Sequence, residues 1–280
     1  MHSTLIETEQ LAELLGTPGL VVLDCRFNLK HPEAGRAAWQ ESHIPGARYV
    51  HLDDDMASHA DENSGRHPLP AIDAFAARLG ALGIQADSQV VVYDDAGGAI
   101  AGRMWWLLRW AGHPTAALLN GGWPKWTREG RPVSDDTPPE SEAQYAASAR
   151  DDLWLTTEAV VEALNQDQVQ LIDARAPERF SGQQEPLDAV GGHIPGSRNI
   201  PFQENLDENG CFKSPEALRQ RFAALAEDAR PVCHSCGSGV TACHNLLAMA
   251  HAGLEPGRLY VGSWSEWIRD SERPIATGNT

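Results

Sequence analysis

An ordered series of sequence landmarks occurs twice along the chain, and this duplication constrains the fold more than any other feature. Leu23-Asp-Cys-Arg26 returns as Ile172-Asp-Ala-Arg175, His43-Ile-Pro-Gly-Ala-Arg48 as His193-Ile-Pro-Gly-Ser-Arg198, and Gly122-Trp123 as Ser263-Trp264. The offset stays between about 141 and 150 residues, too long for a solenoid repeat and suited to a duplicated domain. We therefore expect two domains, residues 1–138 and 153–280, joined by an exposed, polar linker at 139–152.

Both halves alternate strand-like and helix-like patterns. Strand-like runs occur at 20–23, 89–93, 116–119 and 168–172, and helical patterns at 72–82 and 215–225. Strands separated by helices predict an α/β fold, with a mostly parallel sheet and helices on both faces in each domain. In such a fold, ligands bind at the carboxyl ends of the strands.

Composition and charge exclude several classes of protein. No run approaches the roughly 20 apolar residues of a membrane span, and the formal net charge of -17 argues against a nucleic-acid surface. The amino terminus lacks the pattern of a signal peptide, so we expect a cytoplasmic location. Five cysteines, an odd and scattered number, predict reduced thiols rather than a disulfide framework.

The strongest candidate for chemistry is Cys236, in the loop Cys236-Gly-Ser-Gly-Val-Thr-Ala242. An extended run precedes it, and a helical pattern follows from Val240 to His251. Backbone amides and the positive end of the helix dipole at this place favour a thiolate. Gly237 and Gly239 let the backbone fold around an anion, while Ser238 and Thr241 supply hydroxyl groups. A buried structural cysteine is the alternative.

Other chemistries fit this loop less well. Cys233 and Cys236 form a C-x-x-C, but on a strand their Cα atoms would lie roughly 10 Å apart, beyond disulfide reach. A cysteine phosphatase needs an arginine six positions after the cysteine, where this chain has Ala242. In the first half, aligning Gly121 with Gly262 places Asp95 opposite Cys236, so we expect the first domain to be catalytically inactive.

These features together resemble the tandem-domain rhodanese superfamily. The two His-Ile-Pro-Gly segments, the Trp residues at 123 and 264, and a first-half loop without a thiol carry the resemblance over nearly the whole chain. The cysteine loop looks like that of the 3-mercaptopyruvate sulfurtransferases. The thiosulfate-using branch typically has basic residues after the cysteine, where this chain has Gly237 and Ser238.

The resemblance implies roles for particular residues. Cys236, Ser238, Asp53 and His67 would be catalytic, the last three managing protons. Arg179 would hold the substrate carboxylate, and Gly237, Gly239, Val240 and Thr241 would line the binding loop. A second arginine of the family is missing, because Leu187 follows Glu185-Pro186; Arg175 or Arg48 would then take its place, or the donor differs.

The implied reaction is a two-step sulfur transfer. The Cys236 thiolate would take a sulfur atom from a small donor, most simply 3-mercaptopyruvate, and pass it from the persulfide to a thiol, cyanide or thioredoxin-like acceptor. No metal or organic cofactor, nucleic acid or membrane is expected to take part. A thiosulfate sulfurtransferase and a persulfide carrier without turnover remain the alternatives.

Overall fold

The computed structural model describes residues 1–141 and 143–279 and divides into two compact units. The first contains residues 1–58, 70–150 and 208–212, and the second contains 59–69, 151–207 and the chain from 213 onward. The segment 59–69 thus groups with the second unit, although its neighbours along the chain belong to the first. The segment 208–212 groups with the first unit, although its neighbours belong to the second. The boundaries at 138 and 153 stay a prediction.

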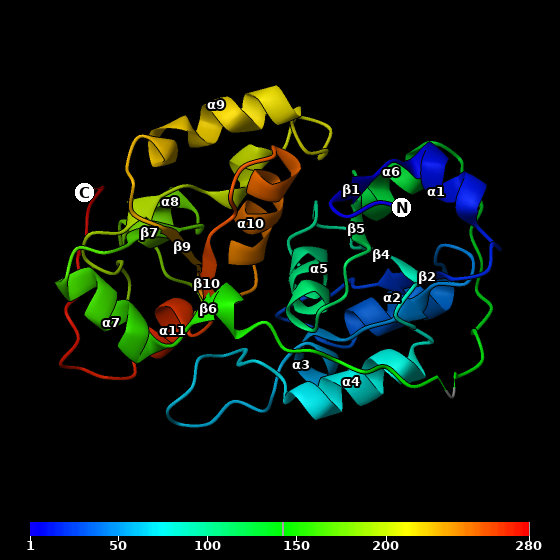
Figure 1. The fold of residues 1–280 in the computed structure, drawn as a ribbon, viewed down its shortest axis with the longest axis horizontal. Coiled ribbons are helices and arrows are strands. Elements are labelled where there is room, and N and C mark those ends of the chain that lie inside the picture. The colour runs from blue at the N-terminus through cyan, green and yellow to red at the C-terminus, as the bar shows by residue number, and fades with distance from the viewer. Residues whose placement is uncertain (142, 280) are drawn as a thin grey trace. The chain divides into compact units, whose positions relative to one another are not determined.

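Each unit repeats one order of elements, shown in Figure 1. In the first unit these are β1 Leu5–Ile6, α1 Thr8–Leu14, β2 Leu20–Asp24, α2 Ala34–Glu41, β3 Arg48–Tyr49, α3 Leu52–Asp55, α4 Ile72–Ala81, β4 Gln89–Tyr93, α5 Ala101–Trp110, β5 Ala116–Leu119 and α6 Gly122–Arg128. In the second they are η1 Asp151–Leu153, β6 Trp154–Leu155, α7 Thr157–Asn165, β7 Gln170–Asp173, α8 Pro177–Phe180, β8 Arg198–Asn199, η2 Phe202–Asn205, α9 Pro215–Ala226, β9 Val232–Ser235, α10 Ala242–His251, β10 Arg258–Tyr260 and α11 Ser263–Trp267.

Both sheets are five-stranded and parallel throughout. Their strand orders, β1-β5-β4-β2-β3 and β6-β10-β9-β7-β8, are the same when the strands are counted within each unit. The central strands β4 and β9 are buried along their whole length, as expected for a sheet covered on both faces. The predicted α/β class with mostly parallel sheets is therefore confirmed.

Helices cover both faces of the second sheet. On one face, Leu171, Cys233 and Tyr260 pack in a cluster with apolar residues of α7 and α11. On the other face, α10 contacts β9 and β10, and α9 packs against α10 (Figure 1). Because α10 follows β9 directly and packs back on the same sheet, the loop between them is fixed at the carboxyl end of the central strand.

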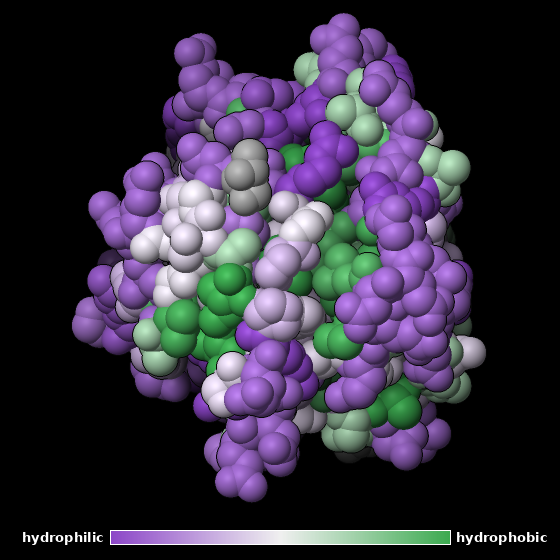
Figure 2. All heavy atoms as spheres, turned by 90° about the vertical axis from the view of Figure 1, so that its left-hand side faces the viewer, coloured by the Kyte–Doolittle hydropathy of each residue, from purple (hydrophilic) through white to green (hydrophobic). Residues whose placement is uncertain are grey.

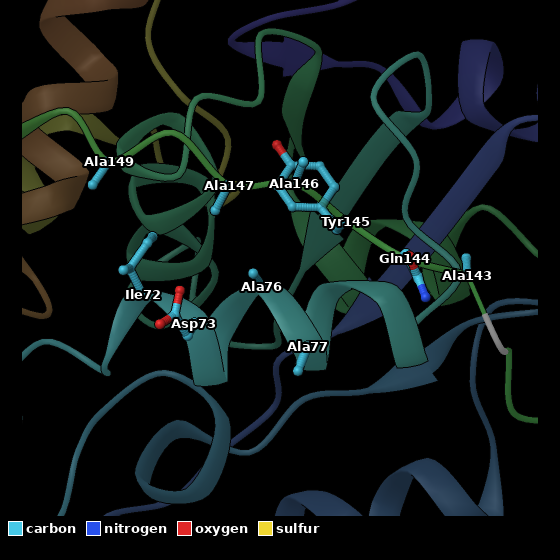
Figure 3. Close-up of a pocket in the computed structure, with 10 residues that line it drawn as sticks. All are labelled: Ile72, Asp73, Ala76, Ala77, Ala143, Gln144, Tyr145, Ala146, Ala147 and Ala149. Carbon is cyan, nitrogen blue, oxygen red and sulfur yellow. The ribbon is translucent and has the colours of Figure 1, made fainter.

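The segment predicted as a linker follows the first unit closely. The amides of Ser141, Ser148 and Arg150 donate hydrogen bonds to carbonyl groups at the ends of α4 and α5. Its residues 143–147 and 149 face α4 across a shallow pocket of about 640 Å³, and Figure 3 shows mostly alanine side chains around this space. Apart from Asp73, Gln144 and Tyr145, its lining is apolar.

The cysteines, the helices and one face of the surface can be compared with the composition. All five cysteines are free thiols. Among the described residues, every helix is too short or too polar to cross a bilayer. Figure 2 shows one face on which hydrophilic residues predominate and apolar residues form only small patches.

Candidate functional site

Cys236 begins the loop between β9 and α10. Its side chain is only 1% exposed. Its amide donates to Ser263 Oγ at 3.1 Å, and its carbonyl accepts from the amide of Trp264 at 3.0 Å. Ser263 adopts a left-handed backbone conformation with φ 53°, which is uncommon for a residue with a side chain. The start of α11 therefore fixes the backbone of the candidate nucleophile.

The strand registers show which first-unit residue corresponds to Cys236. Asp24 pairs with Tyr93 in the first sheet, and the repeated Asp173 pairs with Ser235 in the second. The next residues, Asp94 and Cys236, are therefore equivalent. Aligning Gly121 with Gly262 places Asp95 opposite Cys236, and this prediction is wrong by one residue. The reason is that the first-unit loop from 94 to 100 is one residue longer than the loop from 236 to 241.

Asp94 shows how a negatively charged side chain is held at this position. One carboxylate oxygen accepts from the amides of Ala96 and Gly98 at 2.9 and 2.8 Å. The other accepts from Ile100 and Ala101, both at 2.8 Å. The loop before α5 is thus a cradle of four amides, and the side chain that replaces the thiol fills it.

Two of the corresponding amides in the second unit have no such partner. Thr241 and Ala242 are the equivalents of Ile100 and Ala101 at the start of the helix, and no described residue accepts a hydrogen bond from either amide. Buried amides are rarely left unpaired unless a ligand or charged group uses them. The start of α10 therefore leaves two amides open to an anion beside Cys236, which favours a reactive thiol over a merely structural one.

Ser238 and His67 are brought together within the second unit. Ser238 Oγ lies 2.8 Å from His67 Nδ1, and the two side chains are only 6% and 4% exposed. His67 is therefore a buried residue that contacts the loop of Cys236. Asp53 is an exposed residue of α3 in the first unit, and its place in a proton relay stays a prediction.

Two arginines border the loop at Gly237. A Cβ atom on Gly237 would lie 2.9 Å from Arg66 Nη2 and 3.3 Å from Arg179 Nη2. Arg179 stands on α8, as the resemblance requires, whereas Arg66 comes from the segment 59–69. The loop itself carries no cation, but these two arginines place cations beside the residue that follows the cysteine.

Buried carboxylates hold these arginines. Arg66 pairs with Asp188, and Arg179 pairs with both Asp188 and Glu185. Burial acts to raise the pKa of Glu185, but the hydrogen bonds from Arg179 and from the amides of Leu187 and Asp188, together with the charge of Arg179, outweigh it and leave this pKa below its usual value. Burial raises the pKa of Asp188 despite the nearby Arg66.

Arg175 does not take the place of the missing arginine. It is 2% exposed, pairs with Asp173 and Glu185, donates to the carbonyl of Gly192, and lies over the ring of Trp264 at 4.9 Å. In the first unit, Arg26 pairs with Asp24 and lies over the ring of Trp123 in the same manner. Because the unit without the thiol repeats this arrangement, the arrangement is structural. Arg48 lies in β3 of the first unit.

Sequence reasoning missed Arg66. The only available signal was its position directly before His67, which the family pattern had already marked. Leu187, at the expected position of the second arginine, is 39% exposed.

The arginines and carboxylates of this site form one cluster with balanced charge. It contains three arginines, Arg66, Arg175 and Arg179, and three carboxylates, Asp173, Glu185 and Asp188.

The other cysteine of the C-x-x-C, Cys233, is not a second nucleophile. Cys233 is buried in β9, and burial raises its thiol pKa to about 12, so it stays protonated near neutral pH. No group of three or more potential metal ligands is present among the described residues.

Comparisons with known proteins show the family to which this fold belongs. The model of the rhodanese-like domain matches residues 7–129 and again residues 156–270. A protein of Pseudomonas aeruginosa called a probable 3-mercaptopyruvate sulfurtransferase is 45% identical, over 98% of each chain. The thiosulfate sulfurtransferase of Bos taurus is 39% identical, over 96% of this chain and 93% of its own.

Among solved structures, SseA from Escherichia coli is similar over the whole fold. This protein, described as a 3-mercaptopyruvate sulfotransferase with the rhodanese fold, matches with a TM-score of 0.82 and 30% identity. The match covers 94% of this chain and all of SseA.

Proposed function

This chain belongs to the family of rhodanese-like domains and is a sulfurtransferase, and we propose from this premise that it takes sulfur from 3-mercaptopyruvate through a persulfide on Cys236. The observation that carries the proposal is the pair of open amides, of Thr241 and Ala242, at the start of α10. The equivalent first-unit loop holds the carboxylate of Asp94 with four amides. A thiolate or persulfide on Cys236 would use the same kind of site.

In the first half reaction, the Cys236 thiolate attacks the sulfur of the deprotonated donor. A sulfur–sulfur bond forms and the carbon–sulfur bond breaks, and its electron pair leaves as the enolate of pyruvate. The thiol proton of the donor then returns to the enolate carbon, which gives pyruvate and leaves Cys236 as a persulfide anion. In the second half reaction, an acceptor attacks the outer sulfur and regenerates the thiolate.

Ser238 and His67 are suited to the proton steps. Their hydrogen bond of 2.8 Å is buried, and an imidazole can take and return a proton near neutral pH. We assign the removal of the donor's thiol proton and its return to the enolate to this pair, with Asp53 as a further member. Arg179 would orient the donor carboxylate through its guanidinium.

Thiosulfate is the second candidate donor. Arg66 and Arg179 supply cations beside the cysteine that an inorganic dianion could use, and thiosulfate sulfurtransferases are among the relatives. The balanced charges of the arginine cluster favour a donor with a single carboxylate. The acceptor, whether a thiol, cyanide or a thioredoxin-like protein, and a cytoplasmic location belong to the same proposal, together with an inactive first domain.

Intact mass spectrometry tests both the chemistry and the donor. After incubation with 3-mercaptopyruvate without acceptor, the protein should gain the mass of one sulfur atom, and Cys236→Ala should gain none. Cys211→Ala, which removes a partly exposed thiol in the first unit, should still gain it. A gain with thiosulfate alone would overturn the assigned donor, and a gain by Cys236→Ala would overturn the assigned nucleophile.

A further inference from the structure

The position of Arg66 is fixed by backbone hydrogen bonds in the second unit. Its amide donates to Ser265 Oγ at 3.0 Å, and the amide of Ser265 donates to the carbonyl of Gly237 at 2.9 Å. The preceding residue, Gly65, donates to Glu266 Oε2 at 3.1 Å. Residue 265 of α11 therefore links the backbone at Arg66 to the residue that follows Cys236.

Each arginine is anchored by carboxylates at one edge of its guanidinium. Arg66 Nη1 pairs with Asp188 Oδ1. Arg179 Nε donates to both oxygens of Glu185 at 3.1 and 3.0 Å, and its Nη2 donates to Asp188 Oδ2 at 3.1 Å. Asp188 thus joins the two guanidinium groups and fixes their spacing.

One terminal nitrogen of each guanidinium remains available. No described residue accepts a hydrogen bond from Arg66 Nη2 or from Arg179 Nη1. These atoms lie 2.9 and 3.5 Å from the position that a Cβ of Gly237 would take. The arginine side chains keep 27% and 18% exposure, whereas the two carboxylates that hold them keep only 5%. The cluster thus presents two spare terminal NH2 groups beside the residue next to the nucleophile.

We propose that Arg66 Nη2 and Arg179 Nη1 together bind the carboxylate of the sulfur donor, so that Arg66 supplies the second guanidinium of the substrate site. This inference rests on the proposed function. Two guanidinium groups aimed at one place suit the two oxygens of a carboxylate. Asp188 and Glu185 act as positioning residues, and Leu187 needs no cationic replacement because Arg66 approaches from another segment.

The test compares two donors on the full-length protein. Arg66→Met keeps an unbranched side chain of similar length and removes the guanidinium. With 3-mercaptopyruvate, its KM should rise about 10- to 100-fold, since a hydrogen bond to a charged group contributes an amount of this order. With mercaptoacetone, which has the same thiol and ketone but no carboxylate, wild type and variant should have equal kcat/KM. Arg219→Met, which removes an exposed arginine of α9, should match wild type with both donors.

Two outcomes would overturn the inference. An unchanged KM of Arg66→Met for 3-mercaptopyruvate would show that its guanidinium does not touch the donor. An equal loss with mercaptoacetone would show a role in folding or chemistry instead of carboxylate binding. Pyruvate carries the carboxylate but no sulfur, so its binding, monitored by tryptophan fluorescence, tests carboxylate binding separately from sulfur transfer. If wild type gains no sulfur yet binds pyruvate, and Arg66→Met weakens that binding, the proposed function fails and the inference stands.

Discussion

At the scale of single residues, the duplicated loops give an internal comparison of two side chains at one position. Asp94 and Cys236 follow equivalent strand residues, and both precede a ten-residue helix. The carboxylate accepts hydrogen bonds from the amides of its own loop, whereas the thiol leaves two equivalent amides, of Thr241 and Ala242, open. The same backbone therefore serves structure in one unit and, we propose, catalysis in the other.

This comparison predicts unequal effects for two neighbouring aspartates. Asp94→Ala leaves four amides without an acceptor, three of them buried, and should lower the free energy of unfolding by about 3 kcal/mol or more. Asp95→Ala removes a side chain outside the cradle and should change it by less than about 1 kcal/mol. Calorimetric unfolding of the full chain measures both. Equal effects of the two substitutions would contradict the cradle, and sulfur uptake by Cys236 should persist in each variant.

At the scale of elements, the turn between β9 and α10 depends on the close approach of the segment after β10. Gly239 has φ +74°, and a Cβ there would lie 2.5 Å from the carbonyl oxygen of Val261. A glycine is required for both reasons, because other residues rarely adopt this conformation and the backbone leaves no space for a side chain. The shape of the cradle therefore depends on two chain segments.

Gly239→Ala should accordingly disturb the loop and reduce sulfur uptake by Cys236 at least tenfold, an expectation that follows from misplacing the nucleophile. Gly253→Ala is a matched control, since Gly253 has nearly the same φ of +73° but nothing within 4 Å of the added atom. This control should lose about 1 kcal/mol of stability and keep its sulfur uptake. Rapid-quench measurement of persulfide formation compares the two; normal uptake by Gly239→Ala would disprove the requirement.

At the scale of the whole molecule, a histidine buried in the central strand of the second sheet couples stability to pH. His234 is fully buried, and its Nε2 lies 3.1 Å from the carbonyl oxygen of Pro256. Burial lowers its pKa from 6.5 to about 4. The folded protein therefore keeps this ring neutral under conditions in which the unfolded chain binds a proton.

The sign of the pH effect follows from this difference. Above about pH 6.5 neither state binds the proton and His234 has no effect; as the pH falls towards 4, the unfolded state is favoured. Stability should decrease by about 2 kcal/mol between pH 7.5 and pH 5 through this residue. Urea unfolding at both pH values should show a smaller decrease for His234→Leu, while a variant of the exposed His59 should keep the wild-type decrease. An undiminished decrease in His234→Leu would refute the coupling.

The sequence by itself determined the duplication, the α/β class and the loop of Cys236, because each depends on a pattern that is local or that repeats in order along the chain. The tertiary structure decided which residues from distant parts of the chain lie together at the site. Arg66 reaches Asp188 across 122 residues, and no local pattern encodes that pairing. Likewise, Asp94 is found opposite Cys236 only through the strand registers, since a one-residue difference in loop length is invisible until hydrogen bonds fix which residues are neighbours.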